Sequence, residues 1–208
     1  MEGCSWSPLP EPPLNLLEMQ NVTLNNGAGM PIIGYGVYLV DPSVTERCVL
    51  DALSVGYRSL DTAQYYENEA MVGAAVRKSG IPRDEVFITS KLCLSRPTYA
   101  RAKENVKGSL QRMKLDYLDL MLIHWPMGND GEIWAAFEDL VQEGYLRSIG
   151  VSNFYPAQFD RLVQGASIVP AVNQIELICR NCFHATIKTV CSLMQMPDGW
   201  QDCNFKSI

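Results

Sequence analysis

The fold of this chain is organised around one stretch of sequence, SLDTAQYYENE at residues 59–69. Its first residues continue a strand pattern, and an apolar helical pattern begins near Asn68, so a short loop lies between them. That loop holds a carboxylate at Asp61, phenols at Tyr65 and Tyr66, and an amide. So many polar groups in a short connection indicate a functional loop, which needs partners from other strands.

Strand and helix patterns alternate on both sides of this stretch. Residues 22–32 predict an antiparallel hairpin, because Asn26-Gly27 is a preferred turn dipeptide. Six strands are then expected, closing at about 38, 61, 91, 123, 151 and 175. Five helices are expected at about 45–55, 68–78, 99–113, 132–143 and from Pro156 onward. Regular alternation of this kind predicts a parallel sheet with helices outside it.

Two α/β architectures fit this alternation, an open doubly wound sheet and a (β/α)8 TIM barrel. The open sheet usually carries a GxGxxG pattern after its first strand, but residues 34–39 have Leu39 in place of the third glycine. The barrel is favoured because polar residues lie at or just past the carboxyl ends of five consecutive strands, which is the end where barrel active sites lie. These residues are Asp61, Lys91, His124, Ser152 with Asn153, and Gln174. The expected fold is an incomplete barrel with about six of its eight βα units.

Composition narrows the classes of protein. The chain has 208 residues, 47% of them apolar, and a net charge of −6, so one globular domain is expected and nucleic-acid or membrane partners are not. There is no run of about 18 apolar residues, so no membrane span is expected. Residues 1–18 are acidic and proline-rich, which predicts a disordered extension rather than a secretory signal. Seven cysteines without such a signal predict reduced thiols and a cytoplasmic location.

The polar residues at the strand ends suggest how they depend on one another. Tyr66 is a plausible proton donor only if its pKa is brought down from about 10, and a nearby ammonium does this by stabilising the phenolate. Lys91 on the next strand can supply that ammonium, and Asp61 can balance its charge. His124 on the following strand can orient a substrate oxygen as a neutral imidazole.

Each of these residues also has a purely structural interpretation. An Asp–Lys pair at strand ends is most often a structural ion pair, a histidine before Trp-Pro is often a packed turn residue, and adjacent tyrosines often pack a loop. Taken singly, the structural interpretations are favoured. Together, on successive strands of one rim, the residues favour a catalytic site.

Several motifs resemble the aldo-keto reductase family. They are Asp61-Thr62-Ala63 with Tyr66-Glu67-Asn68-Glu69, Ile88-Thr89-Ser90-Lys91, Leu122-Ile123-His124-Trp125-Pro126, Ile149-Gly150-Val151-Ser152-Asn153-Phe154 and Val172-Asn173-Gln174-Ile175-Glu176. The resemblance covers about residues 20–176 and is nearest to reductases of the 2,5-diketo-gluconate and prostaglandin F synthase type. Residues 19–177 are therefore expected to form one NADP-dependent oxidoreductase domain.

The resemblance implies reduction of small aldehydes or ketones to alcohols by hydride transfer from NAD(P)H, in a monomeric enzyme without a metal. It implies a catalytic tetrad of Asp61, Tyr66, Lys91 and His124, with Tyr66 giving the proton. The implied cofactor contacts are Gly36, Val37, Tyr38, Asp61, Ser152, Asn153 and Gln174, and the implied substrate contacts are His124 and Trp125. NADPH is the expected cofactor, with NADH as the alternative.

The resemblance is expected to stop after residue 177. Residues 178–208 carry four of the seven cysteines and lack the family's late strands, its nicotinamide-stacking aromatic and its basic loop for the adenosine phosphates. The pattern Cys179-x-x-Cys182-x-His184 resembles part of a zinc site, but it has no regular fourth ligand, so no metal is expected. We interpret residues 178–208 as a poorly ordered alternative ending.

An incomplete barrel should leave unpaired edges at its first and sixth strands. Such edges predict poor stability, aggregation and weak NADPH binding. Two hypotheses about function follow: an active aldo-keto reductase, or a catalytically inactive truncated isoform. Turnover of a generic aldehyde, compared between the chain and its Tyr66→Phe variant, separates them.

Overall fold

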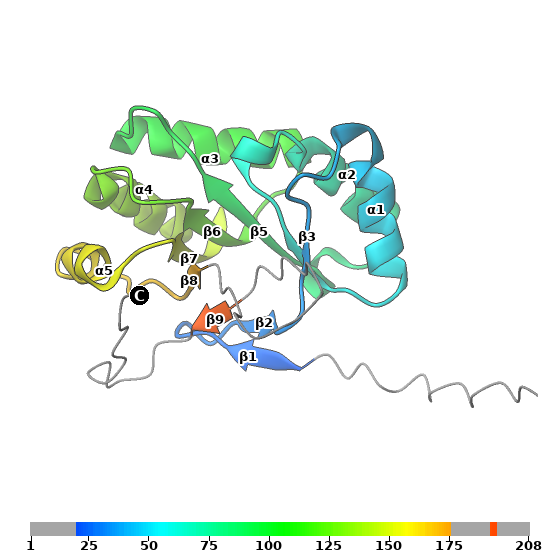
Figure 1. The fold of residues 1–208 in the computed structure, drawn as a ribbon, viewed down its shortest axis with the longest axis horizontal. Coiled ribbons are helices and arrows are strands. Elements are labelled where there is room, and N and C mark those ends of the chain that lie inside the picture. The colour runs from blue at the N-terminus through cyan, green and yellow to red at the C-terminus, as the bar shows by residue number, and fades with distance from the viewer. Residues whose placement is uncertain (1–19, 176–191, 195–208) are drawn as a thin grey trace, which may run out of the picture.

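The computed structural model describes residues 20–175 and 192–194 (Figure 1). Their strands form a hairpin of β1 and β2 and a seven-stranded sheet in the order β3-β4-β5-β6-β7-β8-β9. The strands are β1 (Asn21–Thr23), β2 (Gly29–Pro31), β3 (Tyr35–Gly36), β4 (Ser59–Asp61), β5 (Phe87–Leu92), β6 (Leu118–Ile123), β7 (Leu146–Ser152), β8 (Asn173–Ile175) and β9 (Ser192–Met194). The helices are α1 (Pro42–Ser54), α2 (Glu69–Lys78), α3 (Tyr99–Met113), α4 (Asp130–Gln142) and α5 (Pro156–Val163), with 3-10 turns η1 (Gln64–Tyr66) and η2 (Arg83–Glu85).

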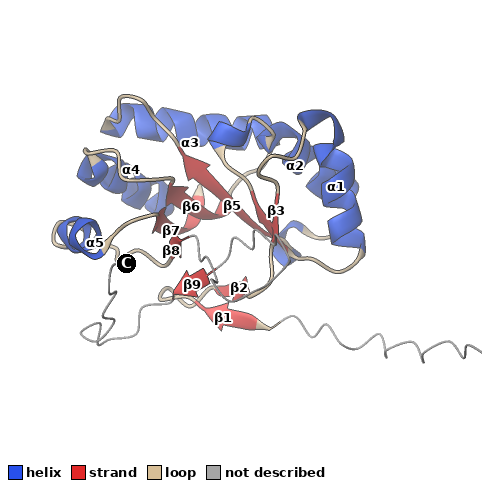
Figure 2. Cartoon of the chain, viewed as in Figure 1, coloured by secondary structure: helices blue, strands red, loops and turns tan. Residues whose placement is uncertain are grey.

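Strands β3 to β8 are parallel neighbours in chain order, and the five helices lie along the outer side of their sheet (Figure 2). The sheet curls into part of a barrel, which confirms the expected incomplete (β/α)8 fold. Because all six strands run the same way, their carboxyl ends form a single rim. The β1–β2 hairpin lies on the inner side of the sheet, opposite the helices (Figure 1).

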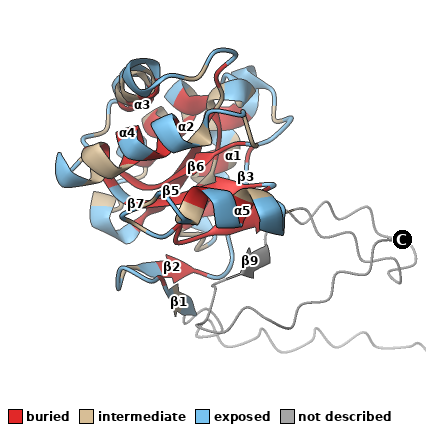
Figure 3. Ribbon diagram, turned by 90° about the vertical axis from the view of Figure 1, so that its left-hand side faces the viewer, coloured by how far each residue is buried: buried red, intermediate tan, exposed pale blue. Residues whose placement is uncertain are grey.

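Both faces of the central strands are buried, so β5 and β6 have no solvent-exposed face. Successive residues of a strand point to opposite faces. On the outer face, Ile88 and Met121 belong to the core beneath the helices. On the inner face, Phe87 belongs to a second core, which the hairpin closes with Met30. Figure 3 shows these buried strands between the helices and the hairpin.

Helix α3 illustrates why these segments become helical. Thr98 precedes it as the N-cap, and its side-chain oxygen accepts a hydrogen bond from Arg101 N. Apolar residues recur every three or four positions, so Val106 and Leu110 are buried against the sheet. Burying each of these side chains is worth roughly 1.5–3 kcal/mol. Lys114 then ends the helix in the left-handed conformation, with φ +54°.

The expected hairpin, the six parallel strands and the five helices are all present, with small shifts at their ends. The first strand is shorter than expected, since β3 is limited to Tyr35–Gly36. Glycine has no side chain to pack in a strand, and two of the residues from 32 to 38 are glycines.

The expectation of an unpaired edge at the sixth strand is wrong. Strand β9 pairs antiparallel with β8, with Ile175 opposite Ser192. The free N–H and C=O groups of a strand edge can pair with any extended segment that reaches them. The sequence of β9 contains no β-branched or aromatic residue, so propensity alone does not indicate a strand there. At the other end of the described sheet, β3 pairs with β4 alone.

Two expectations lie outside the described residues. They are the disordered extension at 1–18 and, apart from β9, the poorly ordered ending at 178–208 with its pattern Cys179-x-x-Cys182-x-His184. In the segments that the structure describes, no helix has both the length and the apolar character needed to cross a bilayer.

Candidate active site

The polar residues expected at the rim converge at the carboxyl ends of the strands. Asp61 is the last residue of β4, Lys91 lies near the end of β5, and His124 directly follows β6. Tyr66 comes from η1, the turn between β4 and α2. Asp61 pairs in register with Thr89, and Lys91 follows two residues later on the same face of β5. Parallel register therefore brings the carboxylate and the ammonium together.

Lys91 is the centre of this cluster. Its side chain is 2% exposed. Its Nζ donates to the Asp61 carboxylate, to Thr62 O at 3.1 Å and to the Tyr66 hydroxyl at 3.4 Å. An ammonium has three protons to donate, and a buried one without such partners is very costly. The expected Asp61–Lys91 pair is therefore formed, and Lys91 also reaches Tyr66.

The pKa of Tyr66 is shifted upward. Burial of the phenol raises its pKa above the ordinary value of 10, and this outweighs the lowering by the nearby Lys91 charge. The Asp61 carboxylate adds a smaller rise. The expectation that Lys91 leaves Tyr66 with a lowered pKa is therefore wrong, because desolvation penalises the phenolate more than one ammonium stabilises it. Tyr66 keeps its proton at neutral pH.

His124 is neutral at physiological pH. Burial, and next the Lys91 charge, lower its pKa from 6.5 to about 4, although Asp61 acts in the opposite direction. The rings of Trp125 and Tyr66 flank the imidazole, with centroid distances of 4.2 and 5.7 Å. Its buried Nδ1 has no hydrogen-bond partner among the described residues. Buried polar atoms are rarely left unpaired, so this nitrogen fits a functional imidazole better than a packed turn residue.

Residues at the ends of β7 and β8 hydrogen-bond to the site residues at the ends of β4 and β6. Gln174 Nε2 in β8 donates to Asp61 Oδ2 over 3.0 Å, although the two residues are 113 positions apart. Asn153 Nδ2 donates to His124 O at 3.2 Å and to Ser152 Oγ at 3.1 Å. Ser152 Oγ donates to Gln174 O at 3.0 Å. These bonds use the amide nitrogens of Asn153 and Gln174 as donors.

The other expected contact residues border the same rim. Val37 is fully buried directly after Gly36, the residue that ends β3. Tyr38 is half exposed, and the centroid of its ring lies 4.9 Å from that of Tyr66. Trp125 is 37% exposed beside His124. The structure thus brings all of the expected site residues to one end of the sheet.

Sequence reasoning missed the part played by Thr62 and Asn68, both fully buried. Besides accepting from Lys91, Thr62 donates through Oγ1 to Asn68 Oδ1 over 2.8 Å. Asn68 Nδ2 in turn donates to Val37 O over 2.9 Å. From the sequence, Asn68 is expected only to begin a helix. The available signal was two hydrogen-bonding side chains beside a buried strand end, where such groups require partners.

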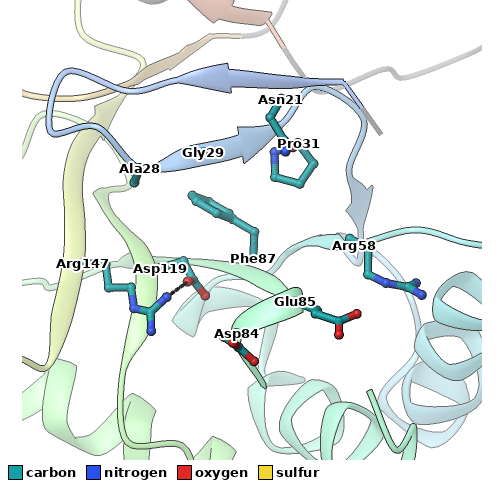
Figure 4. A pocket seen from close by; sticks show the side chains of 10 residues that line it. All are labelled: Asn21, Ala28, Gly29, Pro31, Arg58, Asp84, Glu85, Phe87, Asp119 and Arg147. Atoms are coloured by element: carbon teal, nitrogen blue, oxygen red, sulfur yellow. Dashed lines mark ion pairs between the residues drawn. The ribbon is translucent and has the colours of Figure 1, made fainter. Parts of the chain in front are cut away.

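The cavity drawn in Figure 4 lies at the opposite end of the sheet, between the hairpin and the amino ends of the strands. Its volume is about 380 Å³, and its lining includes Arg58, Phe87, Asp119 and Arg147. Its buried carboxylate is already paired, because Asp119 lies 2.7 Å from Arg83 and 3.6 Å from Arg147. We therefore place the candidate active site at the carboxyl rim, where the titratable groups converge.

Comparisons with known proteins agree with one another. The model of the aldo/keto reductase family matches residues 27–192, which extends past the expected end at residue 177. An aldo-keto reductase of Mycobacterium avium (strain 104) is 48% identical over 159 residues, covering 75% of this chain and 56% of the relative. Morphine 6-dehydrogenase of Pseudomonas putida is 44% identical over 159 residues, covering 75% of this chain and 54% of the relative.

Solved structures give the same result. An aldo/keto reductase from Brucella melitensis superposes with a TM-score of 0.74 at 42% identity, covering 76% of this chain and 63% of that protein. MGS-M4, an aldo-keto reductase from a Medee basin deep-sea metagenome library, superposes with a TM-score of 0.73 at 44% identity, covering 75% and 58%. The chain thus spans between 54% and 63% of the length of these four proteins.

Proposed function

The chain belongs to the aldo-keto reductase family, and we propose that its rim reduces aldehydes or ketones to alcohols with NADPH as the reductant. One observation carries the proposal: a buried ammonium, held by the Asp61 carboxylate, lies 3.4 Å from the Tyr66 hydroxyl. The family consists of oxidoreductases that act on small carbonyl compounds, and the relatives named above support that class of activity.

In this proposal, Tyr66 is the proton donor. Its raised pKa keeps the hydroxyl protonated before the reaction. As the proton passes to the carbonyl oxygen, Lys91 stabilises the phenolate by its opposite charge, and Asp61 holds Lys91 in place. When bound, the reduced nicotinamide supplies the hydride for the carbonyl carbon. Solvent then returns a proton to Tyr66, so one proton is consumed for each alcohol formed.

His124 orients the substrate in this scheme. Because its pKa is about 4, the imidazole is neutral and can donate one N–H to the carbonyl oxygen without adding a charge. Trp125 stands next to it, partly exposed, and supplies an apolar wall for the substrate.

The rim also has groups that fit the nicotinamide end of the cofactor. A carboxamide needs both a donor and an acceptor. The amide oxygens of Asn153 and Gln174 can accept from it. The Ser152 hydroxyl, which accepts from Asn153 Nδ2 and donates to the backbone O of Gln174, is a further polar contact. A Cβ added to Gly36 would meet nothing within 4 Å, so there is open space beside the end of β3. We propose that Gly36, Val37 and Tyr38 border the cofactor there.

The oxidation of NADPH with a generic aldehyde tests the proposal. Tyr66→Phe should lower kcat by roughly a hundredfold to ten-thousandfold, because it removes the hydroxyl that gives the proton and keeps the ring. Tyr117→Phe is the matched control, since that ring lies at the other end of the sheet between Arg83 and Arg147. Turnover that does not depend on Tyr66 would overturn the proposal, and no turnover by the parent chain would favour the inactive isoform.

The same assay with NADH in place of NADPH tests the choice of cofactor. Higher kcat/KM with NADPH is the expected result. The monomeric state and the cytoplasmic location stay predictions, which sedimentation and cell fractionation can test.

A further inference from the structure

The segment that carries Tyr66 is fastened from the outer side of the sheet by a buried carboxylate. Glu69, three residues after Tyr66 and the first residue of α2, is 2% exposed. Its Oε1 accepts from Ser90 Oγ over 2.6 Å. Its Oε2 accepts from Arg112 Nε at 2.9 Å, Arg112 NH2 at 2.6 Å and Ser109 Oγ at 3.2 Å. One carboxylate thus joins α2, β5 and α3.

Ser90 connects this carboxylate to the catalytic strand. It directly precedes Lys91 in β5, and successive strand residues point to opposite faces. Lys91 therefore points into the half-barrel toward Tyr66, while fully buried Ser90 points outward to Glu69. The Glu69 carboxylate is attached one residue from Lys91 and three residues from Tyr66.

The first residue of the Tyr66 turn is hydrogen-bonded to α3, the helix that also carries Arg112. Gln64, the first residue of η1, donates through Nε2 to Ser109 Oγ at 2.9 Å and to Asn105 O at 3.1 Å. Its Oε1 accepts from Cys93 N, just past β5, over 3.3 Å. Ser109 therefore contacts both Gln64 and Glu69, which lie on either side of Tyr66 in the chain.

We propose that Glu69, charge-balanced by Arg112, is a positioning residue that keeps the Tyr66 hydroxyl within reach of Lys91. The proposal rests on the proposed function of Tyr66 as the proton donor. The contact between Lys91 Nζ and the Tyr66 hydroxyl is 3.4 Å long, so a small shift of either segment breaks it. Both segments share one anchor, and its carboxylate is buried while the Arg112 side chain is 47% exposed.

The structure supplies a matched control at the other end of the sheet. Asp119 is also a buried carboxylate, 5% exposed and 2.7 Å from Arg83. It is distant from the rim in the fold and takes no part in the proposed site. Glu69→Gln and Asp119→Asn therefore each replace one buried carboxyl group by an amide, the first near Tyr66 and the second far from it.

Kinetics and native-state hydrogen exchange test the proposal in the whole chain. Glu69→Gln should lower kcat by roughly tenfold to a hundredfold while each KM stays within about threefold, because only the reactive geometry is lost. The amides of residues 62–68 should exchange faster in the same variant. Arg112→Met should reproduce both effects. Arg112→Lys should retain more of kcat than Arg112→Met, since lysine keeps the positive charge but cannot donate two parallel N–H bonds as the guanidinium does. Asp119→Asn should lower the Tm without either effect.

The two proposals fail in different ways. A Glu69→Gln variant with parental kcat and exchange, or an Asp119→Asn variant with the same losses, overturns the positioning role. A parent chain without Tyr66-dependent turnover overturns the proposed function, and the exchange comparison then decides the positioning role alone. If Glu69→Gln does not fold, the same measurements on Arg112→Lys and Arg112→Met take its place.

Discussion

At the carboxyl rim of the sheet Asp61 holds Lys91, whereas at the amino end Asp119 holds Arg83. Both carboxylates lie in strands and accept hydrogen bonds from a buried or partly buried cation. At the amino end, the residues around Asp119 bond and stack only on neighbouring structural groups. Asp119 also accepts a hydrogen bond from Ile88 N at 2.9 Å, and Arg83 and Arg147 both stack on Tyr117. At the rim, the cation reaches onward to Tyr66.

The difference between the two ends follows from the cation. Arginine is always charged and satisfies a carboxylate with a rigid fork, which suits a structural pair. Lysine is a compact point charge, and the charge of Lys91 acts to lower the pKa of both Tyr66 and His124, although burial leaves the pKa of Tyr66 raised. A similar ion pair can thus stabilise the fold at one end of a barrel strand and, in the proposed mechanism, assist proton transfer at the other.

The largest expected effect comes from removing each cation in turn. Lys91→Met leaves the Asp61 carboxylate without its ion pair and should lower stability by about 3–5 kcal/mol. It should also lower kcat by roughly a hundredfold or more, because the charge that stabilises the phenolate is lost. Arg83→Met should cost less stability, since Arg147 remains 3.6 Å from Asp119. Urea unfolding measures the loss of stability in each variant, and aldehyde reduction measures the loss of kcat. Equal losses of kcat in Lys91→Met and Arg83→Met would contradict the proposed difference between the two ends of the sheet.

Acid should affect the two ends in opposite directions. The pKa of His124 falls from 6.5 to about 4 on folding, so its contribution to stability is present above pH 6.5 and is lost as the pH falls toward 4. From pH 7.5 to pH 5 this amounts to roughly 2 kcal/mol, and His124→Asn should abolish it.

Burial instead raises the pKa of Asp119, even though Arg83 lowers it, so its share of stability is present at low pH and is lost as the pH rises through the folded-state value. Asp119→Asn should remove a pH dependence of that opposite sign. Urea unfolding of the parent and both variants from pH 7.5 down to the ordinary Asp value of 3.8 is the measurement. A His124→Asn variant with the parental acid sensitivity would contradict the assignment at the rim.

The smallest expected effect on kcat concerns a single neutral hydrogen bond at each end. Thr62→Val keeps the shape of the side chain but leaves the buried Asn68 oxygen without its donor, which should cost about 1–3 kcal/mol. It should lower kcat by about threefold to tenfold, because Asn68 adjoins the Tyr66 turn. Ser148→Ala removes the 2.9 Å bond from Asn26 at the amino end and should leave kcat unchanged. A loss of kcat in Ser148→Ala would show that activity follows stability alone.

Much of the fold follows from local patterns. Apolar residues at helical spacing predicted α3 at Tyr99–Met113 without error, and alternation of strands and helices predicted the parallel order of β3 to β8. The antiparallel β9 was not predicted, because its pairing depends on the free edge of β8 and not on its own residues. The Asp119–Arg83 pair was not predicted either, since nothing local links residues 36 positions apart.

The sequence by itself determined which polar groups reach the rim. Parallel strands end at the same rim, and their two-residue period sets which side chains face inward, so Asp61, Lys91 and Gln174 meet although they are far apart in the chain. Only the tertiary structure decided the protonation of Tyr66 and His124. Burial raises the pKa of Tyr66 and lowers that of His124, and burial depends on everything packed around a side chain. For the same reason, the hydrogen bonds of Glu69 to Ser90, Ser109 and Arg112 depend on how α2, β5 and α3 pack together.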